Sequence, residues 1–392
     1  MANGSAGNGY AVHAEPKPAP LDASKVTVTL AETLKEVPPP EDLVFGKHMS
    51  DHMMVSTYHP VTGWSDPEIK PYGPFMLDPV SSCFQYSTNL FEGMKAYIGV
   101  DGKPRLFRPE LNMKRMERSL GRVALPSFDT NELLKLIQKL VHVESRWIPN
   151  LNGYSLYVRP TLIGTRASLG VAASDHALLY VVCSPTGPYF RTSRMLSLMA
   201  VSEHVRSWPG GTGGYKLSGN YAPTFMPQKE AAKKGYDQVL WLIGETITEA
   251  GAMNFFVVLQ REDGDLDVYT PPTDGTILPG VTRDTVIALM KAHGSKTNLP
   301  EIPSTQKIHI YEESITVSQV AQWASEGRLL EAFTVGTAVV VASVGRIGVE
   351  GKEDIQLPQH ESSMGPVALS LFEKITSIQE GREQYEDWSL VC

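Results

Sequence analysis

A single lysine, Lys216, stands in the glycine-rich stretch "RSWPGGTGGYKLSGNYAP" of residues 206–223, with Tyr221 shortly after it. Glycines let a backbone approach a ligand closely, and a lysine among them could bind phosphate, do covalent chemistry or face water. A nucleotide-binding P-loop requires glycine directly before the lysine and a hydroxyl residue directly after it. Tyr215 and Leu217 occupy those positions here, so the P-loop is excluded. Covalent chemistry and a solvated lysine remain as alternatives.

Three other segments carry groups that a cofactor site could use. "TILPGVTRD" places residues 280–282 at a predicted helix start, where free N–H groups and the helix dipole favour an anion. "VGTAV" predicts a tight loop at residues 336–338, whose amides could hold a carboxylate. "TEAGAMN" places Glu249 at a strand edge among residues too small to crowd a flat ligand. Taken singly, such features are more often helix caps, turns and solvated strand ends.

Together these groups match the chemistry of pyridoxal phosphate. That cofactor requires a lysine for a Schiff base, an anion site for its phosphate and an acid that keeps its pyridine nitrogen protonated. The phenol of Tyr221 could lie against the ring oxygen of the cofactor, and Arg115 and Arg206 could face its phosphate as cations. The combination favours the covalent role for Lys216.

The composition of the chain limits what else the protein could be. A length of 392 residues predicts two domains of α/β or α+β type. The net charge of −8 provides no basic field for nucleic acid, and no apolar run approaches the roughly 18 residues that would span a bilayer. Cys83, Cys183 and Cys392 lie far apart, which argues against a zinc ribbon or a disulfide scaffold and favours a reducing compartment.

The periodicity of the chain predicts the elements that would position these residues. We expect an N-terminal tail over residues 1–40, a small α/β domain over 41–188, an interdomain loop over 189–199 and a large α/β domain over 200–392. The first domain should contain a hairpin (96–107), two helices (108–125 and 130–148) and two strands (154–164 and 176–185). The second should contain three helices (222–235, within 275–294, and 364–381), a hairpin (237–260) and two strands (266–272 and 332–344).

Two features near the N-terminus concern location and metal binding. Residues 1–24 contain no arginine, carry Glu15 and Asp22 and lack an apolar core, which matches neither a secretory signal nor a mitochondrial presequence. We therefore expect a disordered tail on a cytoplasmic protein. His48 and His52 could share a metal only with a third ligand, and none is in view, so we expect no metal site.

Several long motifs resemble those of a known family, the eukaryotic-type branched-chain amino acid aminotransferases, which are fold-type IV pyridoxal phosphate enzymes. The similarity runs from about residue 43 to the final helix, and the first forty or so residues lie outside it. The motifs that carry it are "LVFGKHMSDHM", "YSTNLFEGMKAY", "LFRPELNMKRM", "SLYVRPTLIG", "GYKLSGNYAPT", "QVLWL", "TEAGAMN", "ILPGVTR" and "VGTA". The resemblance implies the two-domain fold of fold-type IV aminotransferases, pyridoxal 5'-phosphate as cofactor and a homodimer.

The resemblance also implies roles for individual residues. Lys216 would form the Schiff base, Tyr221 would lie beside the ring oxygen, and Glu249 would hold the pyridine nitrogen. The other implied cofactor-binding residues are Arg115, Arg206, Val281, Thr282 and Thr337. The implied substrate-binding residues are Tyr86, Phe91, Tyr157, Arg159, Leu169, Val171, Tyr189, Thr337 and Ala338, of which Leu169 and Val171 would close the pocket of the neighbouring subunit.

The chain departs from the family pattern at two places. Ala252 stands where the family usually has threonine, so one hydroxyl near the cofactor is missing. Val339 and Ala342 stand where mammalian members carry the two cysteines of a redox switch, so regulation of that kind is excluded.

The implied activity is reversible transfer of the amino group of leucine, isoleucine or valine to 2-oxoglutarate. Arg159, with the phenols of Tyr86 and Tyr157, could pair with the second carboxylate of glutamate. D-amino acid transaminase and aminodeoxychorismate lyase share the lysine and glutamate but not the long motifs. A non-catalytic pyridoxal phosphate-binding paralogue is the alternative outside enzymes, although it would be expected to lose Lys216, Glu249 or Tyr221.

Overall fold

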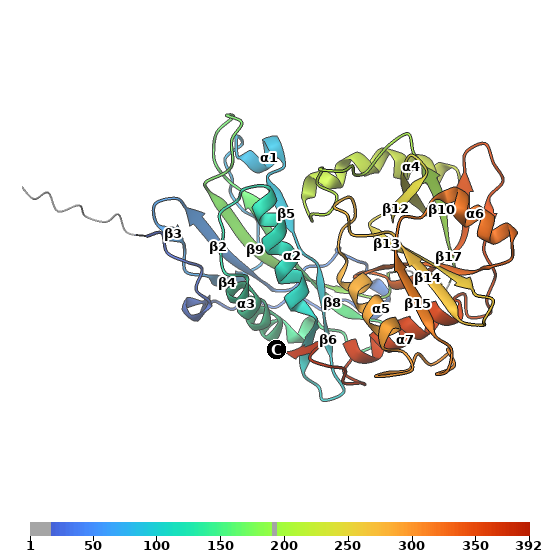
Figure 1. Cartoon of the computed structure of the whole chain (residues 1–392). Helices are drawn as coiled ribbons and strands as arrows, with labels where there is room; N and C mark the ends of the chain where they lie inside the picture. Colours follow the sequence, from blue (N-terminus) through green and yellow to red (C-terminus); the bar gives the residue numbers. More distant parts are fainter. Residues whose placement is uncertain (1–16, 190–193) are drawn as a thin grey trace, which may run out of the picture.

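The computed structural model describes residues 17–189 and 194–392, which form two lobes that each contain a large β-sheet (Figure 1). The first lobe holds the sheet of the N-terminal half with helices α1–α3, and the second lobe holds the other sheet with helices α4–α7. The predicted class, a mixed α/β fold with two units, agrees with this arrangement. The boundary predicted at 189–199 stays a prediction, and residues 190–193 lie outside the described part of the chain.

The first sheet is largely antiparallel. Within the described residues it has ten strands, in the order β1-β4-β2-β9-β8-β6-β7-β19, with β3 on β2 and β5 on β8. Its strands are β1 (Thr27–Val28), β2 (His52–His59), β3 (Gly63–Trp64), β4 (Glu68–Pro71), β5 (Asn89–Phe91), β6 (Met94–Ile98), β7 (Pro104–Phe107), β8 (Ser155–Gly164), β9 (Ala177–Thr186) and β19 (Ser389–Val391). The predicted hairpin is β6–β7, with Gly102 at φ 73° in its turn.

Helices α1 (Ser82–Tyr86), α2 (Pro109–Arg122) and α3 (Thr130–Val143) belong to this lobe. Proline at the first position of α2 is favourable because it lacks only an N–H that would have no helical partner. The Asp129 side chain caps α3 by accepting a hydrogen bond from the backbone N–H of Asn131. Met116 and Leu136 are among the buried side chains that pack these helices into the core, and burying one such side chain contributes about 1.5–3 kcal/mol.

The second sheet closes on itself. Its order is β12-β11-β10-β17-β16-β13-β14-β15, and β12 also pairs with β13, so β12, β11, β10, β17, β16 and β13 form a ring. Its strands are β10 (Leu196–Val201), β11 (Gln238–Ile243), β12 (Thr246–Ala250), β13 (Met253–Gln260), β14 (Leu266–Thr270), β15 (Ile308–Glu312), β16 (Leu329–Gly336), β17 (Val340–Val349) and β18 (Ile355–Gln356). Side chains from every strand of the ring, such as Leu240, Phe255 and Val344, join one buried cluster, which places them inside it.

Helices α4 (Phe225–Lys233), α5 (Val281–Ala292), α6 (Val317–Ser325) and α7 (Pro366–Gln379) surround the second sheet. The outward face of β13 and β16, including Phe256 and Phe333, packs against α5 and α7. A capping box between Thr316 and Gln319 begins α6. The core therefore has two layers around these strands, one inside the ring and one beneath the helices.

Two turns meet at one end of the ring. The register pairs Ala250 with Met253 around the β12–β13 turn and Gly336 with Val340 around the β16–β17 turn. Asn254 pairs with Val335, so these two turns lie side by side. The Asn254 side chain also donates to the carbonyl of Leu278, which brings the start of α5 to the same end.

Some elements differ from the sequence-based expectations. Residues 237–260 were expected to form one hairpin but contain three strands, because Gly244 and Gly251 with positive φ make two turns. Residues 332–344 were expected to form one strand but belong to two, β16 and β17. The expected tail also differs: residues 17–40 lie against the first lobe, where Leu21 is buried and β1 pairs with β4. Residues 1–16 lie outside the described residues.

The C-terminal segment returns to the first lobe, which the sequence did not predict. Strand β19 pairs with β7 at the edge of the first sheet. Figure 1 shows the C-terminus beside this lobe. The guanidinium of Arg108 lies 4.3 Å from the ring centroid of Trp388 and donates to Thr285 in α5 at 2.8 Å. This buried arginine thus joins both lobes to the C-terminal segment.

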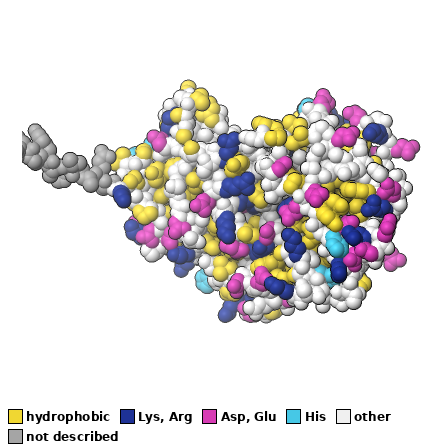
Figure 2. All heavy atoms as spheres, viewed as in Figure 1, with side chains coloured by type: hydrophobic (Ala, Val, Ile, Leu, Met, Phe, Trp, Pro, Cys, Tyr) yellow, Lys and Arg dark blue, Asp and Glu magenta, His cyan; other side chains and the backbone are white. Residues whose placement is uncertain are grey.

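The surface in Figure 2 mixes acidic and basic side chains over both lobes, without one continuous basic area on the face shown. Among the described residues, no helix combines the length and apolar character needed to cross a bilayer.

Candidate active site

The backbone of Lys216 is held by elements of the first lobe. Its N–H donates to the hydroxyl of Ser119 in α2 at 2.9 Å, and its carbonyl accepts from the N–H of Phe91 in β5 at 3.2 Å. The ring of Tyr215 lies under the guanidinium of Arg118, 4.7 Å from its centroid. Helix α2 therefore determines where the glycine-rich loop presents its lysine.

The side chain of Lys216 is half-buried beside two aromatic rings. Its Nζ lies 3.5 Å from the hydroxyl of Tyr221 and 5.1 Å from the ring centroid of Phe91. The rings of Phe91 and Tyr221 are themselves 5.2 Å apart. Three residues predicted from the sequence are thus brought together, and the amine has a phenol within reach.

Glu249 is buried at the end of β12 and forms an ion pair with Arg206. Its other carboxylate oxygen accepts from the N–H of Leu278 at 3.3 Å. Burial raises the pKa of Glu249, while the charges of Arg206 and Lys216 and the bond from Leu278 oppose that rise. The guanidinium favours the carboxylate form of Glu249, which is the form that could hold a protonated ring nitrogen.

A second buried acid, Glu92, was not predicted. Both of its oxygens accept from the Arg115 guanidinium at 2.7 Å, and Asn112 donates to it at 2.8 Å. Burial alone would raise the pKa of Glu92, but Arg115, Lys216 and Asn112 hold it below its usual value. The signal in the sequence is an acid directly after the apolar pair Leu90 and Phe91 and shortly before Met94.

The start of α5 fits a phosphate group. Gly280 is its N-cap residue and provides no side-chain cap, while Val281 and Thr282 are both buried. The amides of the first helical turn have no partner within the helix, so an anion would satisfy them. Arg115 donates to the carbonyl of Pro279 at 3.1 Å, which places its charge next to this helix start. The group that the motifs imply, a phosphate-bearing cofactor, therefore suits the residues present.

The charges that surround Lys216 are already paired. Glu92 is paired with Arg115, and Glu249 with Arg206. The charge of Lys216 also acts on both acids: it helps to lower the pKa of Glu92 and opposes the rise that burial causes in the pKa of Glu249. The lysine therefore lies between two compensated pairs.

The turn between β16 and β17 carries Thr337 and Ala338, both half-buried. The hydroxyl of Thr337 donates to the carbonyl of Gly93 at 3.5 Å, and Nζ of Lys95 donates to the carbonyl of Ala338 at 2.8 Å. These bonds tie the turn to the segment that follows Phe91. Lys95 is another residue that the sequence reasoning missed.

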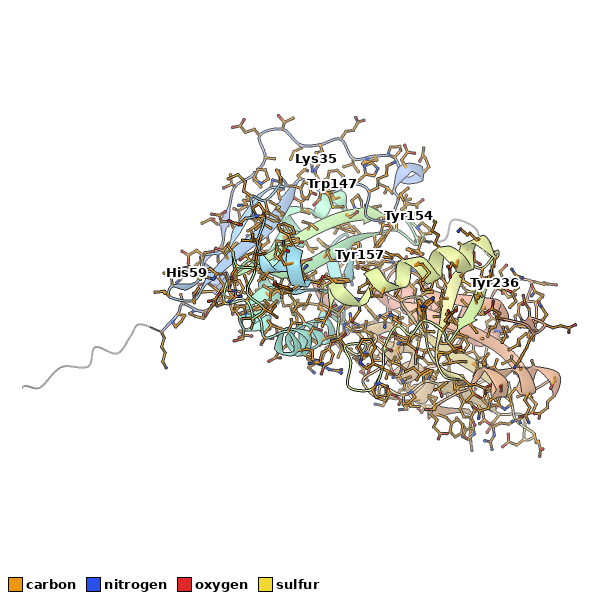
Figure 3. All side chains as sticks on the ribbon, turned by 90° about the horizontal axis from the view of Figure 1, so that it is seen from above. Lys35, His59, Trp147, Tyr154, Tyr157 and Tyr236 are labelled. Carbon is orange, nitrogen blue, oxygen red and sulfur yellow. The ribbon has the colours of Figure 1, made fainter. Side chains whose placement is uncertain are left out.

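Aromatic side chains and Arg159 form one group beside Phe91. The guanidinium of Arg159 lies 4.5 Å from the ring centroid of Phe91, and its Nη2 donates to the Tyr157 hydroxyl at 3.1 Å. Phe45, which was not predicted, packs edge-on against Tyr157 and Tyr189 at 4.7 and 5.8 Å between centroids. Figure 3 shows Tyr157 near the centre of the molecule, where the two lobes meet.

The close approach of Tyr157 depends on Gly93. A Cβ placed on Gly93 would lie 1.9 Å from the Tyr157 hydroxyl, so any larger residue there would displace the phenol.

Three predicted substrate residues lie apart from Lys216 within this chain. The hydroxyl of Tyr86 donates to the carbonyl of Leu169, which ties α1 to the β8–β9 connection. Leu169 is 61% exposed and Val171 is 87% exposed. Among the described contacts, none joins these residues to the group around Lys216.

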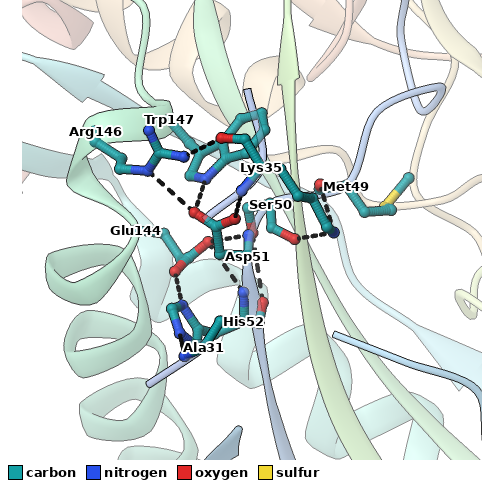
Figure 4. Close-up of polar contacts among 9 residues, drawn as sticks. All are labelled: Ala31, Lys35, Met49, Ser50, Asp51, His52, Glu144, Arg146 and Trp147. Atoms are coloured by element: carbon teal, nitrogen blue, oxygen red, sulfur yellow. Dashed lines mark hydrogen bonds and ion pairs between the residues drawn. The ribbon is translucent and has the colours of Figure 1, made fainter. Parts of the chain in front are cut away.

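His52, weighed as a metal ligand, belongs to a buried polar cluster at the N-terminal end of β2 (Figure 4). Its Nδ1 lies 2.5 Å from Glu144, and its Nε2 accepts from the N–H of Ala31 at 2.9 Å. Asp51 accepts from Trp147 at 2.7 Å and from the N–H of Lys35 at 2.8 Å. This cluster holds the arm of residues 31–35 on the first lobe. The described histidines, cysteines and acids include no group of three placed to hold a metal ion.

Comparison with known proteins identifies the class of this molecule. The model of the family described as Amino-transferase class IV matches residues 89–347, which include Lys216, Glu249 and the turn of Thr337. The chain is 45% identical over 377 residues to a branched-chain-amino-acid aminotransferase, mitochondrial, of Schizosaccharomyces pombe, covering 95% of this chain and 86% of that protein. It is 45% identical over 378 residues to a branched-chain-amino-acid aminotransferase, cytosolic, of Saccharomyces cerevisiae, covering 95% and 98%.

A solved structure also matches the fold. The branched-chain aminotransferase of the thermophilic archaeon Thermoproteus uzoniensis, solved with norvaline, superposes with a TM-score of 0.67 at 23% identity, covering 87% of this chain and 99% of that chain. The fold class predicted from the sequence is thereby confirmed. The chain belongs to the class IV amino-transferase family, within its branched-chain amino acid aminotransferases.

Proposed function

We propose that the protein is a pyridoxal 5'-phosphate-dependent aminotransferase that transfers the amino group of leucine, isoleucine or valine to a 2-oxo acid. The observation that carries the proposal is the convergence of groups at one end of the second sheet. Lys216 lies there between the Glu249–Arg206 pair and the Glu92–Arg115 pair, and Arg115 in turn contacts the segment that starts α5. The family membership of the chain supports the same activity.

Different residues of the chain would bind the cofactor phosphate, the cofactor ring and the substrate. Arg115 with the amides of Val281 and Thr282 would hold the cofactor phosphate, Tyr221 would contact the ring oxygen, and Arg206 would keep Glu249 charged. The amides of the turn at Thr337 and Ala338 would bind the substrate α-carboxylate. When bound, pyridoxal phosphate supplies a carbonyl that bonds to amines and a ring that withdraws electrons from the substrate α-carbon.

Two residues would handle protons. Lys216 in its neutral form would accept the proton of the substrate α-carbon at Nζ. It would then deliver that proton to the carbon of the cofactor that bonds to the amine. Glu249 would hold a proton on the pyridine nitrogen. The phenol of Tyr221, whose hydroxyl lies 3.5 Å from Nζ, would orient the Lys216 amine for this proton transfer.

The proposed substrate site has an apolar wall. Phe91, Tyr157 and Tyr189, with Leu169 and Val171 of a second copy, would surround a branched side chain. A methylene difference in such a wall changes the activation free energy by about 1–3 kcal/mol, so discrimination among the three amino acids should be modest.

The test is the half-reaction without an acceptor. The purified protein, loaded with pyridoxal phosphate, should lose its visible absorption band on adding L-leucine, L-isoleucine or L-valine and release the matching 2-oxo acid. D-leucine is the matched control and should leave the band unchanged. A band that responds only to the D-amino acid, or one that ignores all of these substrates, would overturn the proposal.

We infer that 2-oxoglutarate is the acceptor and that Arg159 binds its second carboxylate. Nε of Arg159 is buried and has no hydrogen-bond partner among the described residues, so it is free to donate to a carboxylate. Arg159→Met should lower kcat/KM for L-glutamate by roughly 10- to 100-fold, the value of a lost charged hydrogen bond, and lower that for L-leucine by less than about fivefold. Arg159→Lys, which keeps the charge, should lose less. Equal losses for both substrates would contradict this role.

We also infer a homodimer. Besides Leu169 and Val171, Phe84 is 61% exposed in the first lobe, and Phe225 is 67% exposed in the second. An interface between two copies would remove such apolar side chains from water, which stabilises association. Light scattering of the purified protein should give twice the chain mass, and a monomer that keeps full activity would contradict the inference.

We also infer a cytoplasmic location. Relatives of this chain include both cytosolic and mitochondrial enzymes, and the cytosolic enzyme of Saccharomyces cerevisiae supports the inference. Microscopy of a C-terminally tagged protein in its source cells would decide, and mitochondrial fluorescence would overturn it.

A further inference from the structure

Lys95 reaches from one lobe to the other. It lies in β6 of the first sheet, paired across to Tyr157 in β8, and its side chain is almost wholly buried. Its Nζ donates to the carbonyl of Ala338 at 2.8 Å, in the turn that joins β16 and β17 of the second sheet. The ammonium therefore ends at the backbone of the turn proposed to bind the substrate carboxylate.

This ammonium has no counterion in the described part of the chain. The buried acids of the site form ion pairs with other residues, Glu92 with Arg115 and Glu249 with Arg206. Burial without a compensating charge lowers the pKa of Lys95 to about 8. A buried, unpaired cation is costly, and the cost falls when an anion binds nearby.

The turn that Lys95 contacts is conformationally strained. Val340, which follows Val339 at the end of the turn, has φ 62°, a left-handed conformation that β-branched residues rarely adopt. Such a conformation persists only where surrounding contacts enforce it. Lys95, through Ala338, and Gly93, through Thr337, provide contacts of this kind from the first lobe.

We propose that Lys95 is a positioning residue of the substrate carboxylate site, which holds the turn at Ala338 and supplies the positive charge that a bound carboxylate faces. The inference rests on the proposed function, because it takes the turn as the carboxylate site. The Lys95–Ala338 bond polarises the peptide group between Ala338 and Val339, so the N–H of Val339, next to the proposed donors, becomes a better donor to an anion. Lys95 itself need not touch the substrate.

The test compares an acid with its neutral counterpart on the cofactor-loaded enzyme. Calorimetric titration with 4-methylpentanoate and with 4-methylpentanamide, at about pH 7, separates binding of the carboxylate from binding of the branched chain. Lys95→Met should weaken binding of the acid roughly tenfold or more, as expected for loss of a buried charge, and change binding of the amide less than about twofold. The visible band of the cofactor should be unchanged.

Two further variants separate charge from structure. Lys95→Gln removes the charge and keeps a polar N–H donor on a side chain one bond shorter. It should also weaken the acid selectively, and it serves if Lys95→Met does not fold. Lys103→Met removes an exposed lysine from the neighbouring β6–β7 turn and should bind both ligands as the unmodified enzyme does.

The outcomes are distinct. Unchanged acid binding in both Lys95 variants, or equal weakening of acid and amide, would overturn the role of Lys95. Failure of the unmodified enzyme to bind 4-methylpentanoate and to react with L-leucine would instead overturn the proposed function.

Discussion

Replacing Lys216 by alanine is expected to lower kcat for the L-leucine reaction by at least about 10³-fold, because one side chain would provide both the covalent attachment and the proton transfer. Nζ of Lys216 lies 3.5 Å from Tyr221, and the charge of Lys216 acts on both Glu92 and Glu249. The loss should therefore appear in kcat at saturating L-leucine.

The location of the covalent bond can be measured independently of turnover. Borohydride reduction of the cofactor-loaded protein, followed by mass spectrometry, should place the phosphopyridoxyl group on the peptide that contains Lys216. Lys229→Ala, which removes an exposed lysine from α4, should retain full activity and the same labelled peptide. A label on another lysine, or more than a few per cent of activity in Lys216→Ala, would contradict the role.

Replacing Glu249 by glutamine should lower kcat by about 10²- to 10³-fold, in the range of a lost proton-holding group, while cofactor affinity falls by less than about tenfold. The amide retains the size of the side chain and an oxygen for the Leu278 N–H, but it carries no charge to hold a protonated pyridine nitrogen. Stopped-flow absorbance with L-leucine measures the turnover, and fluorescence titration measures cofactor binding.

The variant also leaves Arg206 buried without its partner, which alone can cost about 3–5 kcal/mol of folding free energy. The double variant Glu249→Gln with Arg206→Gln should recover part of the thermal stability but not kcat. Glu245→Ala, at an exposed position in the turn between β11 and β12, is the matched control. It should leave both kcat and thermal stability unchanged. If kcat returned together with stability in the double variant, the loss in the single variant would be structural and the role of Glu249 would be wrong.

Local patterns of the sequence predicted the elements that depend mainly on near neighbours. The β6–β7 hairpin and helices α2, α3 and α7 lie where period and turn residues indicated. The error at 332–344 comes from two local patterns that disagree. Most of its residues favour a strand, whereas "VGTAV" predicts a tight loop at 336–338. The chain turns at 337–339, where β16 pairs with β17 and Lys95 contacts Ala338.

By itself the sequence determined the family and the candidates for chemistry, because Lys216, Tyr221 and Glu249 stand in segments whose residue types suit one cofactor. Only the tertiary structure decided which charges meet. Glu92 with Arg115, and Lys95 with Ala338, join residues 23 and 243 positions apart, and no local pattern reports such pairs. These contacts affect stability because a buried charge without a hydrogen-bond or ionic partner costs free energy. Which charges are buried depends on how the two lobes pack.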